Sequence, residues 1–152
     1  MITILSGLVF SLVSFVDRPD EPTDEQVESL RWLSAQEEGK VLSHYEKGLW
    51  IEHFSKKPVL MDDYFYDNNA DARKYKEIAD SIFYSRNLEE TRGYLRENNI
   101  SYIWIDEEMR DGQVWDKEEE GLLFLLRNNE TFKKATIEET QKLRRWLLEQ
   151  AQ

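Results

Sequence analysis

The chain has 152 residues, enough for one domain with a single core, and a formal net charge of −11 from 31 acidic and 20 basic residues. A negative field of this kind repels phosphate backbones, so we expect no nucleic-acid partner. Cysteine is absent, which excludes disulfides and thiolate metal sites.

The chain opens with an apolar segment, residues 1–16, of which residues 2–16 contain no charge and no proline. As a helix these residues would reach about 22 Å, short of the roughly 30 Å hydrocarbon core of a bilayer. Three interpretations remain: the outer part of a membrane helix, a short or tilted anchor, or a core segment of a soluble fold. The segment ends abruptly in an acidic, proline-containing linker at residues 17–22, which indicates a boundary between two environments; the first interpretation is the one that the family resemblance described below implies.

Residues 23–152 are expected to form one α/β domain. Thr23 and Gln26 have the spacing of a capping box, which predicts a helix with Val27, Leu30 and Leu33 inward and Gly39 past its end. Short apolar runs then predict strands at 40–43 and 58–61, joined by a helix at 48–54.

The second half of the chain is also predicted to contain both helices and strands. A polar loop is expected at 62–72, a helix through Tyr75, Ile78, Ala79, Ile82 and Phe83, and a helix capped at Asn87. A third strand is predicted at 100–105, a loop at 110–117, a helix at 118–127, an edge strand at 131–135 and a terminal helix at 137–150.

These elements predict a three-layer α/β sandwich. A small, mostly parallel sheet of about four strands has helices on both faces, preceded by the apolar N-terminal helix. Right-handed crossovers place strand 40–43 between the other two parallel strands or at the switch point beside them.

One stretch resembles a known family. Residues 43–51, Ser-His-Tyr-Glu-Lys-Gly-Leu-Trp-Ile, followed by Lys-Pro-Val-Leu-Met-Asp at 57–62, resemble the segment after the last membrane helix of oligosaccharyltransferase catalytic subunits and related GT-C membrane glycosyltransferases. That family carries a Trp-Trp-Asp-Tyr-Gly-x-Trp-Ile element and then an Arg-Pro-Val-x-x-Asp-like strand. The matching positions are Gly48, Trp50, Ile51, Pro58, Val59 and Asp62.

The four positions before Gly48 depart from the family element, with His44, Tyr45, Glu46 and Lys47 in place of Trp, Trp, Asp and Tyr. In the family this element recognises the hydroxyl side of the acceptor sequence. The resemblance therefore implies acceptor binding by His44, Tyr45, Glu46, Lys47, Trp50, Asp62 and Asp63. It also implies a divalent metal in membrane loops of the parent protein, with no cofactor and no catalytic residue in this chain.

Acidic residues follow each predicted strand, where open α/β sheets place their ligands. Asp62, Asp63, Asp106, Glu107 and Glu108, with His44, could converge to hold a hard cation or serve acid–base catalysis. The favoured alternative is that these acids stay solvated or cap the next helix. A shallow platform for a peptide or glycan could likewise be formed by Tyr45, Glu46, Trp50, Tyr64 and Tyr66. The favoured alternative is that Trp50 is buried and the tyrosines are half-exposed.

The sequence leaves three hypotheses for the function of this chain. The first is a non-catalytic, extracytoplasmic, membrane-associated domain of a GT-C-like glycosyltransferase, with membrane helices and a peptide or glycan acceptor as partners. The second is a free-standing acidic α/β interaction module. The weakest is a metal-dependent hydrolase that uses the acidic rim. Two glycosylation acceptor patterns, Asn99-Ile-Ser101 and Asn129-Glu-Thr131, agree only weakly with an exterior location.

Overall fold

The computed structural model describes residues 21–127 and 132–135. The predictions for residues 1–16, for most of the linker and for the terminal helix 137–150 lie outside these residues. Within the described ranges, no helix is both long and apolar enough to cross a membrane.

The sheet is small and parallel. Strand β1 (Lys40–Leu42) pairs with β2 (Ile100–Ile103), Leu42 lying opposite Ile103. A single parallel bridge joins Val41 to Val59, through bonds from the Val41 amide to the Pro58 carbonyl (2.8 Å) and from the Leu60 amide to the Val41 carbonyl (2.9 Å). β1 therefore lies between the other two segments, as the crossover rule predicted.

The sheet is less extensive than predicted. The expected strand 58–61 contributes only this bridge, because Pro58 has no N–H to donate to a ladder. The strand 100–105 ends at Ile103, although the Trp104 amide still donates to the Leu42 carbonyl (2.9 Å). The edge strand 131–135 is not observed in its described part, since residues 132–135 have no regular structure.

The helices and helical turns are α2 (Asp24–Ser34), the 3₁₀ turn η1 (Tyr45–Lys47), α3 (Gly48–Ser55), α4 (Asp63–Asn68), α5 (Ala72–Phe83), α6 (Leu88–Glu97), the π turn η2 (Met109–Gln113) and α7 (Gly121–Leu125). The helices α2, α3, α5, α6 and α7 follow in the order expected from the sequence, whereas α4 and the turns η1 and η2 were not predicted. The Thr23–Gln26 capping box is complete, and the Asn87 side chain accepts the amides of Glu89 and Glu90. The predicted starts of α2 and α6 are therefore confirmed.

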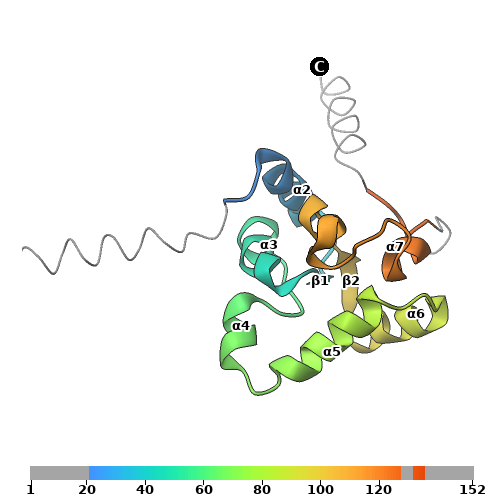
Figure 1. Ribbon diagram of the computed structural model, residues 1–152. Helices are drawn as coiled ribbons and strands as arrows, with labels where there is room; N and C mark the ends of the chain where they lie inside the picture. Colours follow the sequence, from blue (N-terminus) through green and yellow to red (C-terminus); the bar gives the residue numbers. More distant parts are fainter. Residues whose placement is uncertain (1–20, 128–131, 136–152) are drawn as a thin grey trace, which may run out of the picture.

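Side chains of β1 separate two cores. Val41 packs with Leu30, Leu33, Ile51 and Trp104, whereas Leu42 packs in the larger cluster that contains Ile82, Phe83, Met109, Trp115 and Leu122. Successive strand residues point to opposite faces, so each face of the sheet has its own core. Figure 1 shows α2 and α3 on one side of the sheet and α5, α6 and α7 on the other, which confirms helices on both faces.

Three further segments differ from expectation. The predicted loop 62–72 contains α4, because the Asp62 carboxylate caps it at the Phe65 amide (2.6 Å). The predicted loop 110–117 includes part of η2. The helix 118–127 is reduced to α7, since Gly121 has φ +48° and lies against the Phe83 carbonyl, where a β-carbon would clash.

Gly39 also has a different role from the one predicted. α2 ends at Ser34, so Gly39 is not its left-handed cap. A β-carbon at Gly39 would lie 2.5 Å from that of Ser101. Glycine therefore allows the chain to pass closely beside the start of β2.

Candidate binding site at the carboxyl ends of the strands

The residues after β1 and those after the Val59 bridge meet at one edge of the sheet. A β-carbon at Gly48 would lie 2.6 Å from that of Asp62, so only glycine allows this approach. η1, which begins directly after His44, is therefore held beside the start of α4. Residues 44–50 and Asp62, to which the resemblance assigned one acceptor site, therefore lie close together.

Aromatic rings cover part of this edge. Tyr45 stacks on Tyr66 with ring centroids 4.3 Å apart and planes inclined by 13°, and His44 lies against the Tyr45 ring at 4.4 Å. Tyr64 is 73% exposed. Trp50 is half-buried: it packs against the core that contains Leu30 and Leu33, and its ring centroid lies 5.4 Å from the Lys47 ammonium group.

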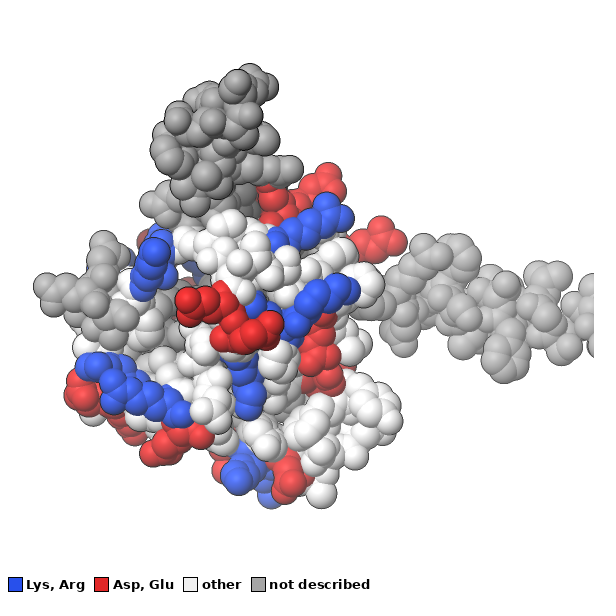
Figure 2. All heavy atoms as spheres, turned by 180° about the vertical axis from the view of Figure 1, so that it is seen from behind, with Lys and Arg blue, Asp and Glu red and all other residues white. Residues whose placement is uncertain are grey.

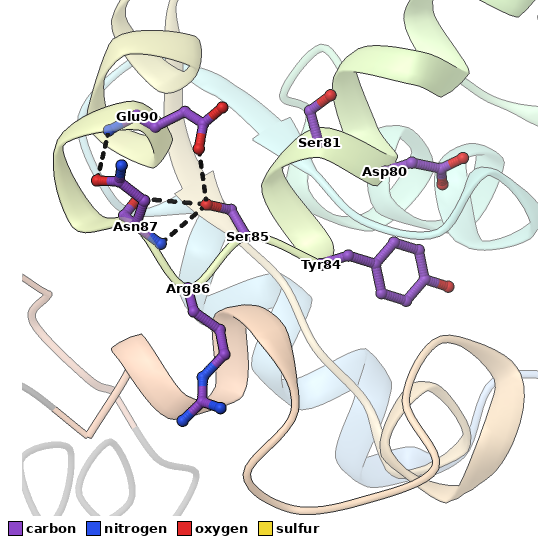
Figure 3. Close-up of a pocket in the computed structure, with 7 residues that line it drawn as sticks. All are labelled: Asp80, Ser81, Tyr84, Ser85, Arg86, Asn87 and Glu90. Atoms are coloured by element: carbon purple, nitrogen blue, oxygen red, sulfur yellow. Dashed lines mark hydrogen bonds between the residues drawn. The ribbon is translucent and has the colours of Figure 1, made fainter.

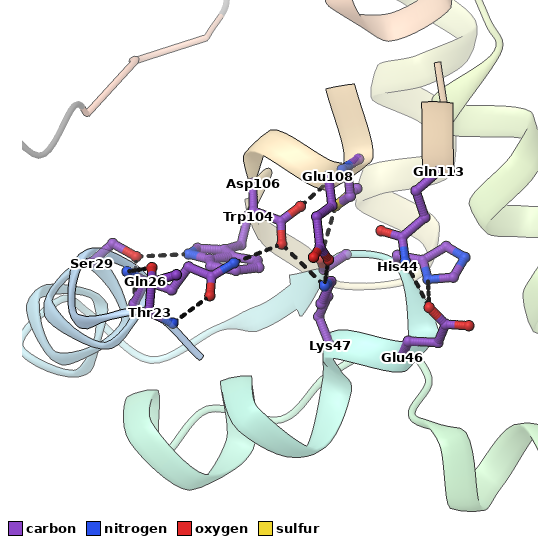
Figure 4. A network of polar contacts seen from close by, with 12 residues as sticks. Thr23, Gln26, Ser29, His44, Glu46, Lys47, Trp104, Asp106, Glu108 and Gln113 are labelled. Carbon is purple, nitrogen blue, oxygen red and sulfur yellow. Dashed lines mark hydrogen bonds and ion pairs between the residues drawn. The ribbon is translucent and has the colours of Figure 1, made fainter. Parts of the chain in front are cut away.

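Lys47 lies beneath this surface and joins the ends of the two strands (Figure 4). Its ammonium group pairs with Glu108 and, at 3.4 Å, with the buried Asp106 carboxylate. Asp106 also accepts bonds from the Gln26 side chain (3.0 Å) and the Met109 amide (2.9 Å). The buried carboxylate thus has partners from α2, η1 and η2, and Lys47 positions the elements around the site.

The protonation of Lys47 is set by two opposed effects. Burial lowers its pKa, but the hydrogen bond to Glu108 and the charges of Asp106 and Glu108 outweigh burial and raise the pKa above 10.5. Lys47 is therefore a fixed cation at neutral pH.

Gln113 reaches the site from η2, and sequence reasoning did not identify it. Its side-chain amide donates to the Glu46 carboxylate (2.7 Å), whose same oxygen lies 3.6 Å from Nδ1 of His44. Gly112, at φ +111°, turns the chain here, and π turns often occur at functional positions. Burial lowers the pKa of His44 below 6.5, despite the opposing charge of Glu46, so the imidazole is neutral at neutral pH.

Three polar atoms at this edge are buried and have no hydrogen-bond partner within the described residues: Nδ1 of His44, Oδ1 of Asp63 and Oε1 of Gln113. His44 and Gln113 also line a cavity of about 110 Å³, together with Tyr45, Lys76, Asp80 and Tyr84. Oxygen atoms of an amide and a carboxylate are acceptors, whereas Nδ1 of His44 lies 3.6 Å from a Glu46 carboxylate oxygen, which favours the tautomer with the proton on Nδ1. The arrangement suits a ligand that donates hydrogen bonds.

The two aspartates after the Val59 bridge differ in environment. Asp62 is occupied by capping α4. The pKa of Asp63 is raised above 3.8 by burial and then by the charges of Glu46, Asp62 and Asp67. A ligand that donates a hydrogen bond to the Asp63 carboxylate would therefore offset both the loss of water around it and its repulsion by the neighbouring carboxylates.

The acidic rim predicted from the sequence is divided. Asp106 and Glu108 contact Lys47, Asp62 caps α4, and Glu107 is exposed. No three His, Asp or Glu side chains in the described ranges are arranged to hold a metal ion.

No protein-family model and no curated protein matches the chain. Among solved structures, the fold is similar to the C-terminal globular domain of an oligosaccharyltransferase from Archaeoglobus fulgidus. The identity is 19%, the TM-score is 0.49, and the alignment covers 76% of this chain and 88% of that chain.

Proposed function

We propose that this chain is a non-catalytic domain of a membrane glycosyltransferase of the oligosaccharyltransferase type, and that the strand-end surface contributes to acceptor binding. The support from the sequence is the element around Gly48, Trp50 and Asp62. The proposed location is extracytoplasmic, docked on membrane helices of the parent protein or of a partner subunit. Any divalent metal would be bound by loops between the membrane helices of the parent protein and not by this chain.

One observation carries the proposal. Asp63 and Gln113 each have a buried oxygen without a hydrogen-bond partner among the described residues, and Gln113 lines a cavity together with Tyr45, which stacks on Tyr66. An extended peptide presents backbone N–H groups and side-chain hydroxyls, which are the donors that these atoms lack. The tyrosine rings add a rigid amphipathic contact of the kind found in peptide-binding surfaces.

On the face opposite to the one seen in Figure 1, the described residues carry charges of both signs. There acidic and basic side chains alternate (Figure 2), so the local fields of the two signs offset each other.

The test is the affinity of the full chain for a fluorescent peptide that carries Asn-x-Thr. Tyr45→Ala should weaken binding about tenfold, because truncating an anchoring aromatic costs more than 1 kcal/mol. Glu97→Ala, which changes an exposed residue at the end of α6, is the matched control and should bind as the parent does. Absence of peptide binding, or equal loss in both variants, would remove the proposal.

The alternative, a free-standing interaction module, predicts a different preference among peptide sequences. A module would bind unrelated peptides equally, whereas an acceptor domain should prefer Asn-x-Thr to a peptide in which Thr is replaced by Val. We also expect no transfer of a sugar from a lipid-linked donor by this chain alone.

A further inference from the structure

The side chain of Gln113 joins η2 to η1 across the candidate binding site (Figure 4). Its amide nitrogen donates to Oε2 of Glu46 at 2.7 Å, and Nδ1 of His44 lies 3.6 Å from the same oxygen. The second oxygen, Oε1, has no hydrogen bond to the described residues, and the Glu46 side chain is 52% exposed. One oxygen of Glu46 is therefore held by the protein, and the other is left to accept a hydrogen bond from a ligand.

The turn η2 is a firm support for this contact. Met109 and Trp115, which lie on either side of Gln113 along the chain, are both fully buried. The Trp115 ring nitrogen donates to a carbonyl group at the end of α5 (2.9 Å), and the Trp115 carbonyl accepts the Gly112 amide (3.0 Å). Glu46 instead lies on a single 3₁₀ turn without a side-chain cap. The better-anchored partner of the pair is thus Gln113.

A larger hollow on the surface lacks such an arrangement. It has a volume of about 490 Å³ and lies at the turn between α5 and α6. Figure 3 shows the side chains of Tyr84, Arg86 and Glu90 pointing in different directions there. The Asn87 side-chain oxygen accepts the amides at the start of α6. This turn therefore does not hold its polar groups toward one ligand, as the contact between Gln113 and Glu46 does.

Holding a glutamate side chain before a ligand arrives favours binding. A long, exposed side chain loses rotamer freedom when it is ordered at an interface, and this loss is smaller where a neighbouring residue already fixes the carboxylate. We infer that Gln113 is a positioning residue, which holds Glu46 so that its second oxygen accepts a hydrogen bond from the bound peptide. This role depends on the proposed function, since it concerns the same surface.

The test compares three replacements of Gln113 in the full chain by their affinity for the fluorescent Asn-x-Thr peptide. Gln113→Met keeps a side chain of similar length but removes the donor, and it should weaken binding about fivefold. Gln113→Lys restores a donor to Glu46 and should stay within about twofold of the parent. Gln113→Glu places a second carboxylate beside Glu46 and should weaken binding the most.

Gln36→Met is the matched control. Gln36 is also half-buried, and its side-chain amide also donates one hydrogen bond, to the Trp32 carbonyl (3.2 Å), but it lies at the end of α2, before β1. Its replacement should leave peptide affinity unchanged. Urea midpoints of each variant report whether the chain is folded. Equal losses of affinity in Gln36→Met and Gln113→Met would overturn the assignment.

A double-mutant cycle shows whether Gln113 acts through Glu46. In a Glu46→Ala background, Gln113→Met should have less than about a twofold further effect, because the side chain that it positions is gone. A further fivefold loss in that background would contradict the positioning role. Peptide binding by the parent that Gln113→Met leaves unchanged would contradict the positioning role alone. Absence of peptide binding by the parent would contradict the proposed function together with it.

Discussion

Lys47→Met tests whether the buried ion pair holds the strand ends together. Methionine keeps an unbranched apolar stem and removes the ammonium. Asp106, whose side chain is 2% exposed, then keeps only its bonds from Gln26 and Met109. Removing one partner of a buried pair costs about 3–5 kcal/mol, and the two remaining bonds place the expected loss near the lower limit, about 3 kcal/mol. For a chain of this size that lowers Tm by roughly 6–12 °C.

The assay is urea and thermal unfolding of the parent and of Lys47→Met. The matched control is Lys76→Met, whose pair with Asp80 has side chains that are 45% and 40% exposed and should contribute less than about 1 kcal/mol. Adding Asp106→Asn to Lys47→Met should recover part of the loss, because it removes the unpaired charge. Equal losses in the two lysine variants, or no recovery in the double variant, would refute the reasoning.

The same pair predicts a pH dependence at high pH. Because the folded-state pKa of Lys47 is raised above 10.5, its contribution is complete below pH 10.5 and is lost as the pH rises through the folded-state pKa. Lys47→Met should therefore remove part of the decline in stability in that range, measured as urea midpoints against pH.

Three other outcomes are expected. Since burial lowers the pKa of His44 below 6.5, its effect on stability should be absent above pH 6.5 and appear as the pH falls through the folded-state pKa; His44→Gln should flatten this decline in urea midpoints, and an unchanged slope would contradict it. Asp63→Asn should raise stability at pH 7 but not below pH 3.8, because a raised folded-state pKa penalises the charged form; equal gains at both pH values would show that charge is not the cause. Gly48→Ala should cost about 1–3 kcal/mol by separating η1 from Asp62, while Gly93→Ala, with open space at its β-carbon within α6, should stabilise by about 0.5–1 kcal/mol; a neutral Gly48→Ala would mean that the contact yields easily.

Features set by local chemistry could be predicted from the sequence. The Thr23–Gln26 box, the Asn87 cap and the α5 stripe through Ala79, Ile82 and Phe83 depend on residues within one or two turns of each other. The meeting of the segments that follow the predicted strands also follows from the sequence pattern, because parallel strands bring their carboxyl ends to one edge.

Features set by distant partners could not be predicted. From the sequence alone Lys47 is expected to be a solvated lysine, because its partners Asp106 and Glu108 lie far from it along the chain. Gln113 is an ordinary loop residue until η2 turns it toward Glu46. The Asp62 cap had a signal, since aspartate is a preferred N-cap, but the polar sequence after it resembled a loop.

The central claim, acceptor binding at the strand ends, is tested most directly by mapping a bound peptide on the amide spectrum of the ¹⁵N-labelled full chain. The account predicts saturable shifts at residues 44–50, 62–66 and 113 on adding an Asn-x-Thr peptide, and their loss in Tyr45→Ala. Shifts confined to the opposite edge, around Lys40 and Ser101, or no shifts at all, would contradict it.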